Sequence, residues 1–217
     1  MTTTTFDAAA IGSERSRPPL LAPLAGLAFV VGLITFFVTP GGDDSGETPR
    51  EVVAYAASHE GWIIAMALFA LATIPLGGIF VAGLLTRLRG LATATESTLV
   101  LIGGIVFTLC FGLAFTVWAA PLTDVSADSA RGLAQAEAYL AVDDIGWVLL
   151  GAAGVGAAMM AIPASLAASR STAVPSWLCW VGVALGVASL GTIAFLGMFA
   201  WMAWIAGASL VMLAGRR

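Results

Sequence analysis

Two related motifs hold most of the side chains that could bind a ligand or a proton. The first motif, residues 54–62, reads Ala-Tyr-Ala-Ala-Ser-His-Glu-Gly-Trp, and the second motif, residues 138–147, reads Ala-Tyr-Leu-Ala-Val-Asp-Asp-Ile-Gly-Trp. Each contains an Ala-Tyr pair, an acidic patch and a Gly-Trp pair, and together they hold the only tyrosines of the chain, Tyr55 and Tyr139. This likeness predicts that the chain contains a duplicated unit.

The acids of the two motifs suggest cation binding. Carboxylate oxygens are the ligands that Ca²⁺ and Mg²⁺ prefer, and a group of carboxylates also attracts cations without a dedicated site. If the two motifs face each other, their acids lie at the same depth around one vestibule. The candidate residues of this vestibule are Tyr55, His59, Glu60, Asp124, Tyr139, Asp143 and Asp144. The chain has no EF-hand spacing, and the favoured explanation is that acids collect outside because arginine is retained inside and loops must be soluble.

His59 is the only histidine, which excludes a bis-histidine haem site and disfavours a transition-metal site within one chain. One interpretation of His59 is a pH-sensitive contact beside Glu60, and the other is an ordinary exposed side chain. The sequence has no Gly-x-Ser-x-Gly, His-Glu-x-x-His, P-loop or dinucleotide motif, and it has no basic patch for nucleic acid. We therefore expect no catalytic residues, no cofactor, no metal site and no nucleic-acid partner.

The composition is that of an integral membrane protein. Hydrophobic residues make up 59% of the 217 residues and charged residues 10%, and the mean hydropathy is +0.98. Soluble domains carry about a quarter charged residues. The lipid bilayer is therefore the first predicted partner.

Charged residues mark the limits of the predicted spans. Four uncharged stretches each exceed the ~20 apolar residues that cross a hydrocarbon core of about 30 Å. The last uncharged stretch, residues 171–215, would form a helix of about 68 Å, so it must fold back, with a turn between Ser189 and Gly197. The sequence predicts an all-α, polytopic membrane helix bundle built from helical hairpins, after a polar and disordered cytoplasmic tail of residues 1–17. The single domain, residues 18–215, has spans at 20–39, 61–85, 98–120, 146–168, 176–191 and 195–214.

The distribution of arginine predicts the orientation. Six crossings place both termini on one side of the membrane, together with seven of the nine arginines: Arg15, Arg17, Arg87, Arg89, Arg170, Arg216 and Arg217. The other side holds two arginines and ten acids. Because arginine is retained on the cytoplasmic side, we expect both termini to be cytoplasmic.

The two outer loops, residues 43–60 and 122–144, each have the pattern of a short interfacial helix. Thr48, a following Pro and Glu51 form the capping-box sequence that starts a helix, which we expect to end near residue 58. Residues 129–142 are Ala-rich and predict a second short helix on the membrane surface. In both loops the chain would then re-enter the membrane through Gly-Trp, which completes an internal repeat of about 85 residues.

The predicted spans contain no ionisable residue in their centres. This pattern disfavours a proton-coupled transporter or a voltage sensor. Their polar groups are hydroxyls, which usually bond to their own helix or a neighbouring one: Thr35, Thr73, Thr108, Thr116, Ser165, Ser189 and Ser209. Small residues recur every four positions, from Gly104 to Thr116, from Ala153 to Ser165, and at Gly182 and Gly186. Such stripes predict close helix packing, either within the bundle or at a dimer face.

The last hairpin opens with Val-Pro-Ser-Trp-Leu-Cys-Trp-Val-Gly at residues 174–182 and closes with Leu-Ala-Gly-Arg-Arg at residues 213–217. With the acidic outer helices and the Gly-Trp pairs, this order of features resembles a bacterial family of six-span membrane proteins of unknown function. The likeness covers nearly all of the chain past residue 18. It implies a six-span fold in the bacterial inner membrane and no known activity, cofactor or catalytic residue.

Two classes of function remain from these observations. The leading hypothesis is a non-enzymatic accessory, scaffold or sensor component that acts with a membrane protein partner or as a homo-oligomer. The alternative is a small permease or channel for a neutral or apolar solute. A stable co-purifying partner would favour the first, and a continuous polar cavity at the membrane midplane would favour the second.

Overall fold

The computed structural model describes residues 20–38, 48–123 and 130–215, and every regular element in these ranges is helical. The all-α class is therefore confirmed for these residues. In chain order the elements are α1 (Leu21–Val38), α2 (Pro49–Ser58), α3 (Glu60–Leu88), α4 (Ala94–Ala119), the 3₁₀ helix η2 (Ala120–Leu122), α5 (Ala130–Ala168), α6 (Ser176–Ala188), the 3₁₀ helix η3 (Ser189–Ala194) and α7 (Leu196–Ala214).

Five helical segments are long and apolar enough to cross a membrane: Glu60–Leu88, Ala94–Leu122, Arg131–Ala168, Ser176–Ala194 and Leu196–Ala214. α1 is a shorter apolar helix over the residues whose side chains are described, Leu21–Thr35. Large apolar side chains cover much of the bundle surface, and Leu68 and Leu71 are each 62% exposed. Lipid acyl chains solvate such a surface, whereas water does not. The helices thus fit a multi-pass protein in contact with a bilayer.

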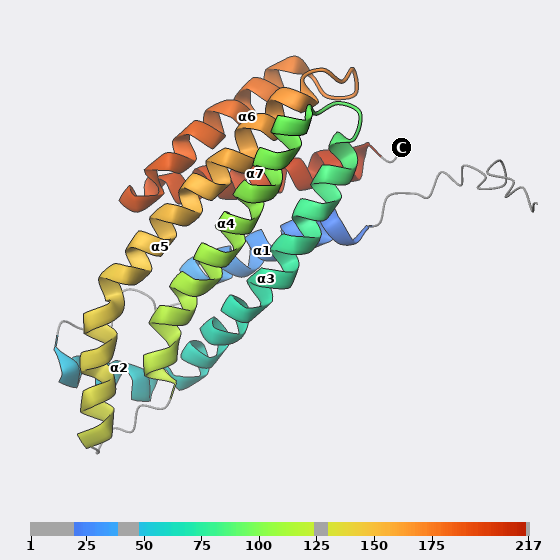
Figure 1. Cartoon of the computed structure of the whole chain (residues 1–217). Helices are drawn as coiled ribbons and strands as arrows, with labels where there is room; N and C mark the ends of the chain where they lie inside the picture. Colours follow the sequence, from blue (N-terminus) through green and yellow to red (C-terminus); the bar gives the residue numbers. More distant parts are fainter. Residues whose placement is uncertain (1–19, 39–47, 124–129, 216–217) are drawn as a thin grey trace, which may run out of the picture.

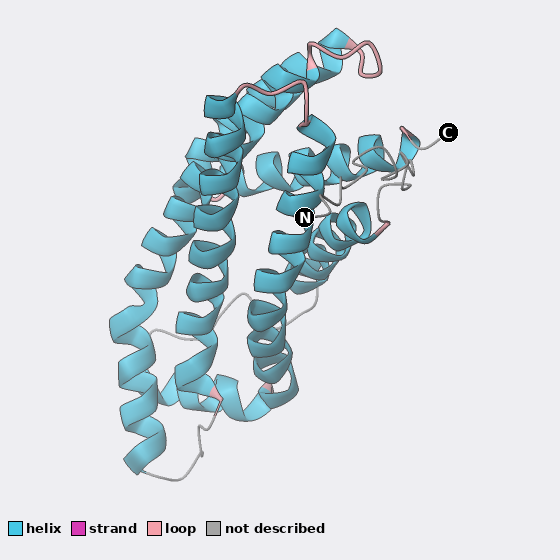
Figure 2. Cartoon of the chain, turned by 45° about the vertical axis from the view of Figure 1, so that its right-hand side comes forward, coloured by secondary structure: helices cyan, strands magenta, loops and turns pink. Residues whose placement is uncertain are grey.

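α3, α4 and α5 lie side by side along most of the bundle, with α4 between the other two (Figure 1). α1 packs against α3 and α7, and α6 packs against α5. α2 lies across one end of the bundle and contacts α5 more extensively than α3, although α3 directly follows it in the chain (Figure 2).

α2 and α4 both begin with a capping box. The Thr48 hydroxyl accepts a hydrogen bond from the Glu51 N–H at 3.4 Å, and the Glu51 carboxylate accepts one from the Thr48 N–H at 3.0 Å. Thr93 and Glu96 repeat the arrangement at 3.2 and 2.7 Å. Each box satisfies two backbone N–H groups that a helix start would otherwise leave without a partner.

α5 corrects one prediction. Instead of a separate short helix at 129–142 and a re-entry at Gly146, the structure has one uninterrupted helix of 39 residues, about 58 Å long. It is about twice as long as the hydrocarbon core is thick, and its charged residues lie in the N-terminal half, so that half must lie outside the core. The helix continues because neither a proline nor a glycine stands between Leu133 and Ile145.

An aromatic cluster fills the centre of the bundle. Trp201 of α7 is fully buried, with ring centroids 5.0 Å from Phe107, 5.5 Å from Phe111 and 5.9 Å from Phe29. Phe107 and Phe111 belong to α4 and Phe29 to α1. Most of these contacts are edge to face, the arrangement that aromatic quadrupoles favour. The cluster ties three helices together with apolar surface alone.

Glycines allow the closest helix contacts. A Cβ at Gly103 of α4 would lie 2.6 Å from the Met160 nitrogen, and a Cβ at Gly156 of α5 would lie 2.8 Å from the Gly103 oxygen, so the two backbones touch. The Gly104 and Gly112 stripe instead faces α3. These glycines pack within the chain, as the bundle interpretation of the stripes requires.

A turn at Phe195 joins η3 to α7. Phe195 has φ +66° and ψ −41°, a conformation that L side chains rarely adopt. Residue 197 is a glycine because a Cβ at this position would collide with the backbone of Thr192 and Gly191. The chain thus reverses between Ser189 and Gly197 without a residue that carries charge.

Candidate functional site: a module at one end of the bundle

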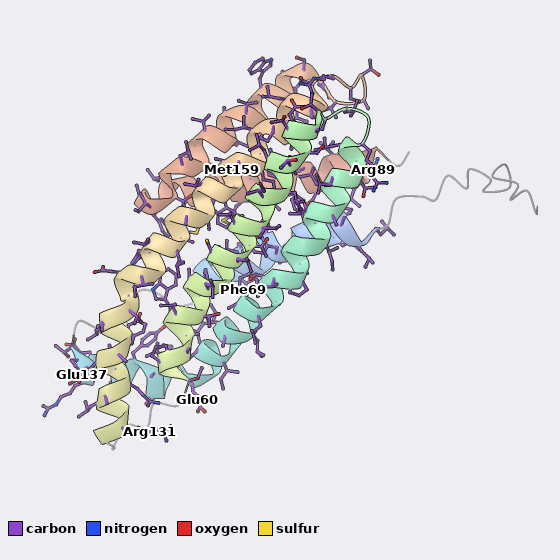
Figure 3. All side chains as sticks on the ribbon, in the orientation of Figure 1. Glu60, Phe69, Arg89, Arg131, Glu137 and Met159 are labelled. Carbon is purple, nitrogen blue, oxygen red and sulfur yellow. The ribbon has the colours of Figure 1, made fainter. Side chains whose placement is uncertain are left out.

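The two sequence motifs meet in a small module that we call the α2–α5 module. It comprises α2, η2, the start of α3 and residues 130–144 of α5. Glu60, Arg131 and Glu137 mark this end of the bundle, and Arg89 lies at the opposite end (Figure 3). The module has its own apolar core, formed by Val52, Val53, Ala56, Ile63, Leu122 and Ala136. None of these residues belongs to the large core of the bundle.

Equivalent positions of the two motifs pack on this core. Tyr55 and Tyr139 are both half-buried against it, as is Leu140. Tyr139 follows Tyr55 by 84 residues, and the same interval separates Val52 from Ala136 and Ala56 from Leu140. The structure therefore brings the predicted tyrosines together, and it does so through the apolar sides of α2 and α5.

His59 joins α2 to α3. Its backbone N–H donates to the carbonyls of Tyr55 at 3.0 Å and Ala56 at 3.3 Å, and its own carbonyl accepts from Trp62 and Ile63. Its ring stacks on Tyr55 with centroids 4.5 Å apart, and Nδ1 lies 3.0 Å from the Tyr55 carbonyl oxygen. Because a carbonyl oxygen only accepts, this contact favours the tautomer with the proton on Nδ1. His59 acts as a structural joint between the helices.

The structure does not gather the predicted acids into a metal site. Glu60 and Asp144 are exposed and Asp143 is half-buried, whereas Asp124 lies outside the described residues. Within residues 20–38, 48–123 and 130–215, no group of three or more His, Cys, Asp or Glu side chains could hold a metal ion. The described part of the module is therefore a packed surface with charges around it.

The two Gly-Trp pairs differ in their surroundings. A Cβ at Gly146 would collide with the indole of Trp118, whereas a Cβ at Gly61 would meet no atom within 4 Å. Trp118 in turn contacts Trp147 edge to face, with centroids 5.4 Å apart. Gly146 is thus the seat for Trp118 of α4, a role that no sequence pattern indicated, because the two residues lie far apart in the chain.

At the opposite end, two arginines tie helix ends together. Arg170, at the end of α5, forms two hydrogen bonds with the Glu96 carboxylate, at 2.6 and 2.7 Å, and one with the Leu91 carbonyl at 3.0 Å. Arg87 donates to the Met212 carbonyl at 2.9 Å, near the end of α7. The Arg170 bonds, followed by the bond from the Thr93 N–H, lower the pKa of Glu96 to about 2. Glu96 precedes the uncharged part of α4, so this ion pair lies outside the apolar span.

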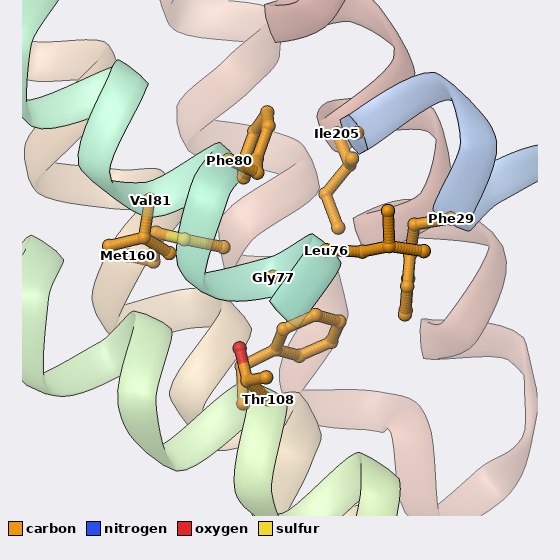
Figure 4. A pocket seen from close by; sticks show the side chains of 10 residues that line it. Phe29, Leu76, Gly77, Phe80, Val81, Thr108, Met160 and Ile205 are labelled. Atoms are coloured by element: carbon orange, nitrogen blue, oxygen red, sulfur yellow. The ribbon is translucent and has the colours of Figure 1, made fainter. Parts of the chain in front are cut away.

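One pocket of the protein lies inside the helix bundle. A pocket between α1, α3, α4, α5 and α7 has a volume of about 10 Å³, close to the space that one water molecule occupies (Figure 4). Thr108 supplies the one polar side chain of its lining and donates to the Gly104 carbonyl at 2.7 Å. The pocket is thus apolar and small.

The hydroxyls of the spans are used within the bundle. Thr35, Thr73, Thr108 and Thr116 donate to carbonyls of their own helix, and Ser189 of η3 donates to the Leu185 carbonyl of α6. Ser165 accepts from the Trp204 indole at 3.1 Å. The Ser209 hydroxyl is buried and makes no hydrogen bond. These contacts match the structural interpretation of the hydroxyls.

Comparisons with known proteins add no relative: no protein-family model matches the chain, and neither a curated protein nor a solved structure shows significant similarity to it.

Proposed function

We propose that the chain is a non-enzymatic, multi-pass membrane protein that serves as an accessory, scaffold or sensor component through the α2–α5 module. The observation that carries this proposal is the separate apolar core of the module, which holds α2 against the projecting half of α5. A helix that only connected two spans would not need such a core. A preformed surface beyond the hydrocarbon core is suited to contact with another protein.

The packing of the bundle argues against the alternative of a permease or channel. A solute path needs polar groups that face a continuous cavity. Instead, Trp201 and three phenylalanines fill the centre, and six of the seven span hydroxyls bond within the bundle. These features support helix packing as the role of the spans.

The proposal includes six spans, with α1 as the first, and both termini in the cytoplasm of a bacterial cell. Gly83 of α3 faces Ala22 of α1 and Phe69 of α3 faces Gly32, so the two helices run antiparallel. At the end opposite the module, Arg87 links the end of α3 to the end of α7, and Arg170 links the end of α5 to the start of α4. Because arginine-rich ends are retained in the cytoplasm, these arginines support a position of the α2–α5 module on the outer side.

A reporter that is active only after export, fused after Arg217, tests this topology. We expect no reporter activity. An active reporter would mean an odd number of crossings and would overturn the six-span proposal. The resemblance to the bacterial six-span family is part of the same proposal and depends on the same result.

Co-purification tests the function. Full-length tagged protein, cross-linked in cells and solubilised in mild detergent, should retain a membrane protein partner. Ala138→Trp places a bulky side chain on an exposed position of the module and should abolish this capture. Leu109→Trp, on a lipid-exposed position of α4 that is 45% exposed, is the matched control and should not. Equal capture by both variants would contradict a role for the module.

A further inference from the structure

α2 has three buried side chains, and all three are apolar. Its buried side chains are Val52, Val53 and Ala56. They contact the core of the α2–α5 module, which shares no residue with the large core of the bundle. A helix of ten residues is too short to be stable alone in water. Elements with few buried contacts open before the rest of a protein unfolds.

His59 supplies a hinge for such an opening. Its N–H completes the hydrogen bonds at the end of α2, and its carbonyl accepts those at the start of α3. The φ and ψ bonds of His59 lie between these two groups. Rotation about them therefore moves α2 relative to α3 without breaking a backbone hydrogen bond of either helix.

The surroundings of the hinge also allow movement. His59 already lies outside the helical region, at φ −127° and ψ 26°. The ring of His59 stacks on Tyr55 and contacts Ser58, and both of these residues belong to α2. The ring would therefore move together with α2. A Cβ at Gly61 would meet no atom within 4 Å, so no side chain of the described residues packs over this point of α3.

α5 cannot move in the same way. It runs through Asp143 and Asp144 as one helix, and Gly146 is packed directly against Trp118. The N-terminal half of α5 therefore lacks the break in the helix that His59 makes between α2 and α3.

We infer that α2 is a hinged strap, which swings away from α5 about His59 while the bundle stays folded. Opening uncovers Leu122, Ala136, Tyr139 and Leu140, the apolar surface that α2 covers in this structure. A molecule that binds at this end of the protein would change the conformation of the protein by moving the strap. The inference concerns the isolated protein and does not depend on the proposed partner.

Hydrogen exchange measured by mass spectrometry on the full-length protein in detergent micelles tests the strap. We expect amides of residues 50–58 to exchange at least about tenfold faster than those of residues 130–143. Val52→Ala removes a fully buried side chain and should speed exchange in residues 50–58 by about a further tenfold, while α3 and α5 stay unchanged. Leu133→Ala, on a position of α5 that is 39% exposed, is the control and should change nothing in α2.

Equal exchange in α2 and the projecting half of α5, with both responding together to Val52→Ala, would overturn the strap. The wild-type comparison decides the question even if Val52→Ala does not fold, and Ala56→Gly provides a second perturbation of the same core. A strap without a captured partner would leave the inference standing and remove the proposed function. A captured partner together with equal exchange in α2 and α5 would support the proposed function and overturn the strap.

Discussion

The two motifs share a sequence pattern but differ in structure at the same point. In the first motif the chain breaks at His59, and α2 and α3 are separate helices. In the second motif the helix continues through Asp143, Asp144 and Gly146. The difference lies in the residues after each tyrosine. In the first motif Ser58 and His59 bond to carbonyls of the last turn of α2, and His59 leaves the helical region at φ −127° and ψ 26°. The glycine of the second motif lies inside α5 and is packed against Trp118.

A repeated pattern can thus serve two mechanical roles. One motif makes a hinge and the other makes a continuous rod, and the two then pack on each other through equivalent positions. The N-terminal half of α5 gives α2 a continuous surface on which to pack. If both motifs broke the helix, neither segment would provide such a surface.

Proline substitutions at the two glycines should give the largest contrast. Gly146→Pro removes a backbone hydrogen bond in the interior of α5 and clashes with the preceding turn, so it should cost about 3 kcal/mol or more. Gly61→Pro lies in the first turn of α3, where proline is tolerated, and should cost about 1 kcal/mol or less. Thermal unfolding in detergent measures both, and equal losses would show that α5 is not a continuous helix.

Alanine substitutions at the same positions should give a smaller contrast. Gly146→Ala forces Trp118 away from α5 and should destabilise the protein by about 1 to 3 kcal/mol. Gly61→Ala meets open space and should be neutral or stabilising by up to about 1 kcal/mol, since alanine favours a helix. The order of the two unfolding temperatures is the readout. A lower value for Gly61→Ala would contradict the packing described for Gly146.

Glu96, at the end of the bundle opposite the α2–α5 module, should contribute to the response of the protein to acid. The folded-state pKa of Glu96 is lowered from 4.5 to about 2, so its contribution to stability is present above pH 4.5 and is lost as the pH falls toward 2. Glu96→Gln should remove this part of the acid-induced loss, which is modest because Arg170 is largely exposed. Unfolding temperatures of the wild type and of Glu96→Gln, measured between pH 6 and 2.5, should converge as the pH falls. Parallel curves would exclude this ion pair as their source.

Divalent cations should have the smallest effect. Since the described acids form no group that could hold a metal, millimolar Ca²⁺ or Mg²⁺ should leave the unfolding temperature unchanged. A rise that is lost in the Asp143→Asn plus Asp144→Asn variant would restore the cation-binding interpretation of the second motif. Hydrogen exchange of α2, measured with and without the cation in the wild type and in this variant, would then show whether the cation holds α2 against α5.

The helical class, the membrane-compatible lengths and the capping box at Thr48 could be predicted from the sequence. They depend on local composition, on the distance between charges and on residue types three positions apart, all of which are visible in a linear pattern. The likeness of the two motifs was also visible. It predicts a separate short helix at residues 129–142, which is wrong because this segment continues through Gly146 as part of α5, whereas the first short helix is confirmed as α2.

How the motifs are used depends on contacts between distant residues. The seat of Trp118 on Gly146, the contact of Gly103 with Gly156, and the pairing of Glu96 with Arg170 join residues that lie tens of positions apart. No local pattern encodes such contacts, since they depend on how neighbouring helices are placed. Local sequence was enough to specify apolar helices with two related motifs, and the packing between those helices decided that one motif bends while the other stays straight.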